Sequence, residues 1–226
     1  LFAPHVFSDA NHVYGKMVFD DYYHQFLVTA ELAKKDKTSL WIFKFHPQGY
    51  MYNEEKINLE LIKNYKQKNI VICPKKFDTN SLIEISDLII TGRGTAGLES
   101  ACNGKKPLLS GESYYSNSGI THNSLSIIDY KNKALNHKLN SKLTKKQILE
   151  AKKLYYLFHF KNSFVKEDKL KFSNYLTLNE KKPNLVQQYF SENNFTNLLA
   201  KQLKNKIDIS KDNQFKHFEK LWLERR

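Results

Sequence analysis

The chain has 226 residues, 41% hydrophobic and 13% aromatic, enough for one sizeable core or a core with a small helical appendage. No apolar run approaches the roughly 18 residues of a membrane-spanning helix, which excludes such a span within this sequence. Residues 1–130 carry 14 Lys and Arg against 14 Asp and Glu, whereas residues 131–226 carry 22 against 9, so the net charge of +13 lies entirely in the C-terminal part.

Short apolar runs alternate with helical patterns over residues 1–130. The chain starts at Leu1 inside the first run, without an initiator Met, and is therefore expected to begin within a longer protein. The predicted strands are residues 1–7, 39–45, 69–73, 87–91, 106–110 and 124–128, and the predicted helices are about 20–35, 54–67, 79–85 and 95–103. Nearly continuous apolar runs are typical of strands buried on both faces of a parallel sheet. The pattern predicts an α/β fold, a Rossmann-like parallel sheet with helices on both faces.

The strand pattern stops after about residue 130. Helices are predicted over residues 144–160, with Thr144 as N-cap, from Pro183 onward, and over Asn213–Glu224. Phe215, Phe218 and Trp222 form one stripe of the last helix, and we expect such a stripe to pack in a core. The sequence therefore predicts a Rossmann-like domain over residues 1–130 and a basic helical extension over residues 131–226.

The charge of the extension has two interpretations. A basic excess favours anionic partners such as phospholipid headgroups, acidic polysaccharide or nucleic acid. The alternative is compositional drift in a chain rich in Lys, Asn and Ile. The lysines expected on exposed helix faces are Lys145, Lys152, Lys153, Lys201 and Lys204. The two cysteines, Cys73 and Cys102, have neither metal nor disulfide spacing, which fits a reducing compartment and core positions.

Unusual polar residues follow three of the predicted strands. In an open α/β sheet, ligands bind beyond the carboxyl ends of the strands, where the strand order reverses. A strand order of 3-2-1-4-5 would place that point between the first and fourth strands. Loops 8–12 and 92–97 would meet there, with His46 and Pro47 beside them. This agreement between topology and residue type predicts one binding cleft.

The loop after the fourth strand matches the pattern G-x-G-x-x-G, from Gly92 to Gly97. Glycines let the backbone approach a phosphate, and a helix N-terminus supplies N–H groups and partial positive charge. Arg93 could pair with phosphate oxygens. Thr95 could bind there or cap the helix. Glu112 follows Gly92 by 20 residues, as in a dinucleotide site, but that motif normally follows the first strand of the fold, not the fourth.

Imidazole and carboxylate groups provide the remaining candidates. His46 could donate to a phosphate or simply bond to the backbone at the strand end. Asp9 and His12 could act as general base or hold an acceptor hydroxyl. Asp20 and Asp21 lie in the same stretch but are expected to cap the following helix. No D-x-D pattern and no His/Cys set with metal spacing occurs in the sequence, so we expect no metal ligands.

Three segments together resemble the capsule polysaccharide biosynthesis family, which includes the Kdo transferases of capsule export. They are HVFSDANHVYGKMVFDDYYHQFL, KFHPQG and DLIITGRGTAGLESACNGKKPLLSGESYYSNSGIT, and the resemblance covers roughly residues 1–125. It implies one half of a GT-B glycosyltransferase, the domain that binds a nucleotide-sugar, often CMP-Kdo. The chain departs from the family at Arg93-Gly94-Thr95, where the turn often carries Ser.

The resemblance also implies roles for individual residues. His46 of the His-Pro pair, with Pro47, would contact the nucleotide phosphate. The small-residue turn with a following Glu, here Gly94, Thr95 and Glu99, would hold phosphate and ribose, and Gly92 and Arg93 join these candidates on the chemistry given above. Asp9 and His12 are the catalytic candidates.

The resemblance finally implies a cellular role. It is transfer of a sugar, with Kdo a candidate, to a growing capsule or surface polysaccharide by a cytoplasmic protein peripheral to the inner membrane. The expected partners are the donor, a lipid-linked or polysaccharide acceptor and an anionic membrane surface, with no cofactor, metal or nucleic acid. The alternatives are a teichoic-acid-like glycerophosphotransferase and a non-catalytic nucleotide- or glycan-binding module.

Overall fold

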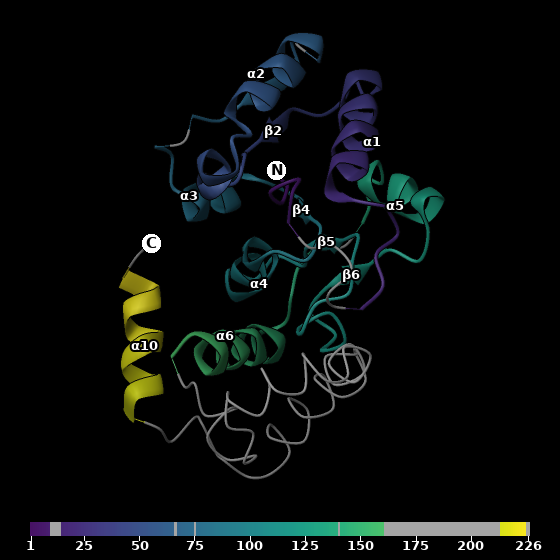
Figure 1. The fold of residues 1–226 in the computed structure, drawn as a ribbon. Coiled ribbons are helices and arrows are strands. Elements are labelled where there is room, and N and C mark those ends of the chain that lie inside the picture. Colours follow the sequence, from purple (N-terminus) through teal and green to yellow (C-terminus); the bar gives the residue numbers. More distant parts are fainter. Residues whose placement is uncertain (10–14, 66, 75, 140, 161–212, 225–226) are drawn as a thin grey trace, which may run out of the picture.

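A six-stranded parallel sheet forms the centre of the molecule, in the order β3-β2-β1-β4-β5-β6 (Figure 1). The computed structural model describes residues 1–9, 15–65, 67–74, 76–139, 141–160 and 213–224. The strands are β1 Phe2–Ala3, β2 Trp41–Phe43, β3 Ile70–Ile72, β4 Ile90–Thr91, β5 Leu108–Leu109 and β6 His122–Asn123. The predicted α/β fold and the order 3-2-1-4-5 are confirmed, and β6 extends that order at one edge.

Helices cover both faces of the sheet (Figure 1). They are α1 Tyr22–Lys35, the 3-10 helix η1 Pro47–Tyr52, α2 Glu55–Asn64, α3 Thr79–Ile85, α4 Thr95–Cys102, α5 Ile127–Ala134, α6 Lys145–Phe160 and α10 Asn213–Glu224. Alternate strand residues serve the two faces: Phe2 and Ile90 pack with α1, α2 and α5, whereas Leu1 and Ile89 pack with α3. Burial on both faces is why the strands are apolar at successive positions.

The predicted strand over residues 124–128 is wrong. The last strand is β6, His122–Asn123, and the apolar residues after it begin helix α5. The Ser126 hydroxyl accepts a hydrogen bond from the Asp129 backbone N–H at 3.1 Å, so a serine N-cap starts a helix inside the apolar run. The first strand is also shorter than predicted, because Pro4 follows Ala3 and cannot donate to a ladder.

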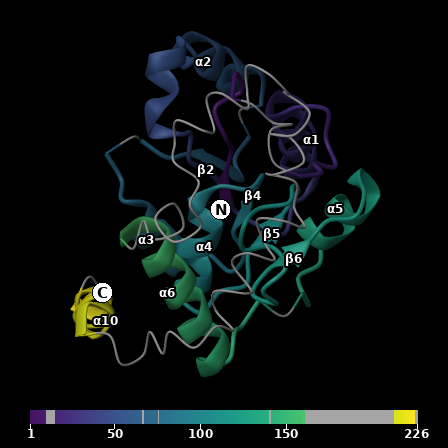
Figure 2. The same ribbon diagram turned by 60° about the horizontal axis from the view of Figure 1, so that its bottom comes forward.

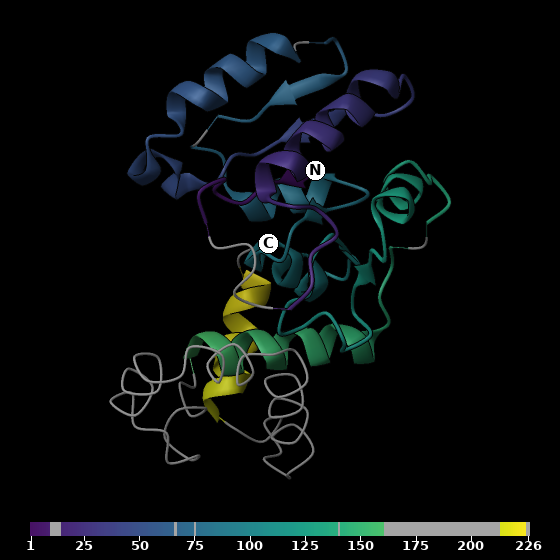
Figure 3. The same cartoon turned by 45° about the vertical axis from the view of Figure 1, so that its right-hand side comes forward.

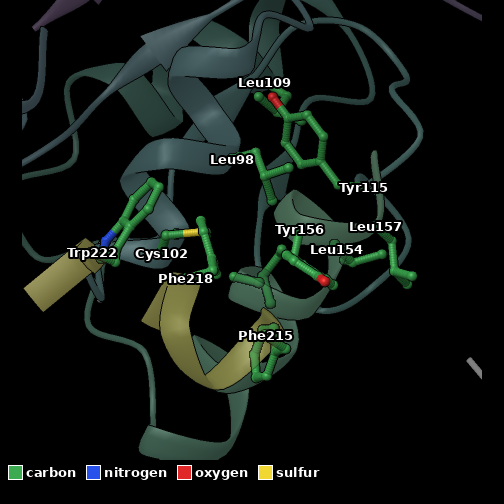
Figure 4. Close-up of a cluster of buried hydrophobic side chains, with 13 residues drawn as sticks. Leu98, Cys102, Leu109, Tyr115, Leu154, Tyr156, Leu157, Phe215, Phe218 and Trp222 are labelled. Carbon is green, nitrogen blue, oxygen red and sulfur yellow. The ribbon is translucent and has the colours of Figure 1, made fainter. Parts of the chain in front are cut away.

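A second core joins α4, α6 and α10 below the sheet (Figures 2 and 3). The side chains of Phe215, Phe218 and Trp222 are 0%, 9% and 6% exposed, which confirms that the aromatic stripe packs in a core (Figure 4). Trp222 Nε1 donates to Asn103 Oδ1 at the end of α4, at 3.2 Å. The described helices after residue 130 are thus packed against the sheet domain, and the division of the chain at residue 130 stays a prediction.

Two further predictions about the C-terminal region have different outcomes. Thr144 caps α6, because its Oγ1 accepts from the Gln147 backbone N–H at 3.3 Å. Lys152 was expected on an exposed face but is buried, and its Nζ lies 3.4 Å from Glu219 Oε1 of α10. The helix that was predicted to begin at Pro183 lies outside the described residues, and so do Lys201 and Lys204. Within the described residues, no helix has the length and apolar character needed to cross a membrane.

Candidate functional site

The two central strands bring the candidate loops to one edge. Phe2 and Ala3 of β1 are in register with Ile90 and Thr91 of β4, and β2 lies on the other side of β1. All of these strands are parallel, so their carboxyl ends share one edge. The segments after β1, β2 and β4, which hold residues 4–9, 46–47 and 92–97, therefore meet at the point where strand order reverses.

Helix α4 begins at this edge without a side-chain cap. Gly94 is its N-cap, in an extended conformation, and as a glycine it has no side chain to cap the first turn. Helices α1 and α3 start at the same edge, but Asp21 and Asp78 cap them with their own carboxylates. Thr95 is the first helical residue and is exposed, so it does not cap the helix. The first turn of α4 thus offers N–H groups and positive potential to an anion.

Close packing accounts for the glycines of this turn. The Tyr115 hydroxyl donates to the Gly94 carbonyl at 2.5 Å. A Cβ at Gly97 would overlap that hydroxyl and lie 3.1 Å from Leu109 Cδ2. The glycine at position 97 is therefore required by Tyr115, which follows β5 and which the sequence pattern did not single out.

Arg93 is buried, with only 8% of its surface exposed. Its guanidinium lies against Gly111, after β5, because a Cβ added at Gly111 would lie 3.2 Å from both Nε and Nη2. The positive charge of Arg93 is therefore buried at the carboxyl edge of the sheet, beside the 92–97 turn. Its role as a phosphate ligand stays a prediction.

His46 ends the segment of β2 and caps the 3-10 helix that begins at Pro47. Its Nδ1 accepts from the Gln48 backbone N–H at 3.2 Å. Burial lowers the pKa of His46, while the nearby carboxylates of Asp9 and Glu54 raise it. A neutral imidazole that accepts at Nδ1 carries its proton on Nε2. The backbone interpretation of His46 is therefore confirmed, and its role as a donor to a phosphate through Nε2 stays a prediction.

His5 is a site residue that the sequence reasoning missed. It follows β1, stacks on Tyr22 with ring centroids 4.3 Å apart, and accepts the Arg93 backbone N–H at Nε2, at 3.3 Å. Its Nδ1 lies 3.8 Å from Asp9 Oδ2. Burial lowers the pKa of His5 to about 4, with smaller lowering contributions from His46 and Arg93, against the raising effect of Asp9. The available signal was its place as the first residue of the segment HVFSDANH.

The acidic candidates have different positions: one lies at the candidate site, and two lie at the start of helix α1. Asp9 is exposed beside His5, whereas His12 lies outside the described residues. Asp21 caps α1 through the His24 N–H, which confirms the capping interpretation, and Asp20 pairs with the His24 ring at 3.0 Å.

Two glutamates complete the inventory of this edge. Burial and, to a smaller extent, the charge of Asp78 raise the pKa of Glu99. Glu112 Oε2 accepts the Lys16 backbone N–H at 2.6 Å.

The glycine motif follows β4, not β1, which leaves the dinucleotide interpretation without its usual topology. Among the described residues, no group of three or more His, Cys, Asp or Glu side chains is placed to hold a metal ion.

A model of the family described as "Capsule polysaccharide biosynthesis protein" matches residues 2–160, the whole sheet and α6. The chain belongs to this family. A solved structure similar to it is KpsC of Thermosulfurimonas dismutans, a beta Kdo 2,4 transferase, with 13% sequence identity and a TM-score of 0.39. That match covers 66% of this chain and 42% of the KpsC chain, so this chain spans less than half of that protein. A search of curated proteins found no match.

Proposed function

We propose that this chain is the nucleotide-sugar-binding part of a glycosyltransferase that extends a capsule or related surface polysaccharide. The observation that carries the proposal is that His46 and the uncapped start of α4 lie at the same edge of the sheet, beside the β1–β4 switch point. Membership of the capsule family supports the class of product. CMP-Kdo is the first donor to test, and a lipid-linked or polysaccharide acceptor completes the reaction.

The chemistry follows from the charge that develops when a sugar leaves a nucleotide. The departing phosphate gains negative charge, which hydrogen-bond donors aimed at it stabilise. The first N–H groups of α4 and Nε2–H of His46 are such donors, and the buried Arg93 adds positive potential to the same edge. Asp9, exposed at this edge, is the candidate to hold or deprotonate the acceptor hydroxyl. Transfer would proceed without a metal ion.

The first experiment is a thermal-shift and calorimetric screen of the chain against CMP, CDP, UDP, GDP and NAD, in buffer with EDTA. A ligand at 100 times its Kd stabilises the folded state by about 2.7 kcal/mol. We expect a cytidine or uridine nucleotide to bind with EDTA present and NAD not to bind. Binding by NAD alone, or nucleotide binding only after Mg²⁺ is restored, would contradict the proposal.

A pair of variants at Thr95 tests the start of α4 directly. Thr95→Asp places a carboxylate in the first helical turn, where the helix dipole favours it, so the stability of the fold should be equal or higher. The same carboxylate repels a phosphate, and we expect nucleotide affinity to fall at least about tenfold. Thr95→Asn, a neutral side chain of the same size, is the control and should bind as the parent does.

His46→Ala should weaken nucleotide binding by about 1.5–3 kcal/mol, the range for hydrogen bonds to charged groups. The matched control is His137→Ala, because that exposed histidine bonds to Thr38, ahead of β2 at the opposite edge of the sheet. Equal loss in both variants would point to a general effect of removing a histidine. No loss in either would remove His46 from the site.

A further inference from the structure

The backbone of Arg93 has an unusual hydrogen-bond partner. Its N–H lies in the turn between β4 and α4, and it donates to the side chain of His5, 88 residues earlier in the chain. The bond therefore joins the segment after β1 to the turn after β4, across the switch point of the sheet. A side chain that receives a turn's N–H fixes the orientation of that peptide.

The His5 ring is itself held on several sides. It stacks on Tyr22 at an interplanar angle of 15°. Added Cβ atoms at Gly92 and Gly94 would lie 3.0 Å from His5 Cδ2 and 3.3 Å from His5 Nε2, so the turn is folded directly onto the ring. Asp9 Oδ2, 3.8 Å from Nδ1, favours the tautomer that carries its proton on Nδ1. That tautomer leaves Nε2 as the acceptor that the Arg93 N–H needs.

From this geometry we propose that His5 is a positioning residue for the nucleotide-binding turn. By accepting the Arg93 N–H it turns that peptide inward and leaves the following N–H groups, at the start of α4, directed at the ligand. This inference rests on the proposed function for its ligand, but the His5–Arg93 bond can be tested without any ligand. Its role is carried by one hydrogen-bond acceptor, which distinguishes it from a residue that only fills space.

Two substitutions separate acceptor from ring. In His5→Gln the side-chain oxygen can reach the place of Nε2, so the acceptor is kept while the ring is lost. In His5→Phe the stacking on Tyr22 is kept while the acceptor is lost. We expect His5→Gln to bind CMP within about twofold of the parent and His5→Phe to bind about tenfold more weakly. If His5 acted by packing alone, His5→Phe would bind CMP more tightly than His5→Gln, and that result would overturn the proposal.

Hydrogen exchange in the absence of ligand provides the independent measurement. The Arg93 amide should exchange at the parent rate in His5→Gln and faster in His5→Phe. Unchanged exchange in His5→Phe would overturn the proposal, whatever happens to CMP binding. If the parent binds no nucleotide at all, the proposed function fails, and the exchange rates still decide whether His5 holds the turn.

Stability is measured in parallel by thermal unfolding. If His5→Phe does not fold, His5→Asn takes its place, because its shorter side chain keeps polarity but cannot reach the Arg93 N–H. We then expect His5→Gln to retain Arg93 protection and CMP binding and His5→Asn to lose both. Equal behaviour of the Gln and Asn variants would count against the proposed bond.

Discussion

At the scale of single residues, the position of Tyr115 explains why residue 97 of the 92–97 turn is a glycine. Tyr115 is fully buried and bonds to Gly94, and its hydroxyl occupies the space that a side chain at residue 97 would need. The pattern G-x-G-x-x-G predicted a phosphate-binding turn. In the structure, Gly97 leaves the room that the Tyr115 hydroxyl occupies.

Gly97→Ala should therefore destabilise the fold by about 1–3 kcal/mol, the usual cost of overpacking. The same change in a Tyr115→Phe background should cost less, because the hydroxyl that the new methyl meets is gone. Denaturant unfolding of the two single variants and the double variant gives the coupling energy, which we expect to be about 1 kcal/mol or more. Additive effects would show that the overlap with Tyr115 is not the cause.

The lowered pKa of His5 predicts a pH dependence of stability. The pKa is about 4 in the folded chain and 6.5 in its unperturbed state, so the unfolded chain binds the extra proton as pH falls below 6.5. Stability should be lost between about pH 6.5 and pH 4, by at most about 3 kcal/mol. The groups that act on His5 are Asp9, His46 and Arg93.

The measurement is the free energy of unfolding in denaturant at pH 7, 5.5 and 4.5. His5→Gln has no titrating group at this position, so its stability should fall less steeply over that interval. Titratable groups that do not interact with His5 contribute equally to both proteins, so the difference between the two slopes reports the titration of His5 and its coupling to Asp9 and His46. Identical slopes would contradict the assignment.

Some site residues were predictable from the sequence because their setting is local. His46 precedes a proline at a strand end, and Gly94 lies between a strand and a helix, so both positions follow from neighbouring residues. The partners of His5 and Tyr115 were not predictable, since they lie 88 and 21 residues away in the chain. Only the packing of the sheet brings those pairs together.

At the scale of elements, the sequence predicted those with a strong period and failed where a cap competed with an apolar run. The helix Thr79–Ile85 was predicted to the residue, and its N-cap Asp78 explains the sharp start. Residues 124–128 were predicted as a strand, although Ser126 and Asp129 carry the signal of a helix start. β-branched residues after a serine fit either element, and tertiary packing decided between them.

Helix α10 should be held by its buried stripe and not by its other apolar residues. Phe215→Ala should destabilise the fold by about 3–5 kcal/mol, because that side chain is fully buried against Tyr156 of α6. Leu223→Ala, on the exposed side of the same helix, is the control and should change stability by less than about 0.5 kcal/mol. Thermal unfolding that is equally reduced in both variants would contradict this placement of α10.

At the scale of the whole molecule, the charge asymmetry is the property that the fold does not explain. All of the net +13 belongs to residues 131–226, and the described part of that region pairs some of its lysines internally. Lys152 bonds to Glu219 and Lys153 to Glu150, so those two do not present their charge freely to a surface. Lys145 and Lys146 at the start of α6 are exposed.

We therefore propose that the basic region binds anionic membrane surfaces. The chain should co-sediment with vesicles that contain phosphatidylserine and not with neutral vesicles. Each Lys or Arg near such a surface contributes about 1 kcal/mol, and salt screens the attraction over about 8 Å at physiological ionic strength. Reversing Lys145 and Lys146 to Glu should weaken recovery, whereas Lys63→Glu on α2 should not. Equal recovery with both lipids at every salt concentration would leave the charge as composition.

The position of Tyr115 also predicts a thermodynamic coupling between the candidate site and the C-terminal helix. Its hydroxyl holds the turn before α4, while its ring lies in the core that α6 and α10 complete (Figure 4). A ligand that stabilises the turn should then slow amide exchange in α10. The free energy by which the ligand stabilises the docked α10 should equal the binding free energy that is lost when α10 is detached. Such reciprocity would make the C-terminal helix an allosteric regulator of the site. A ligand that leaves α10 exchange unchanged would show that the two are independent.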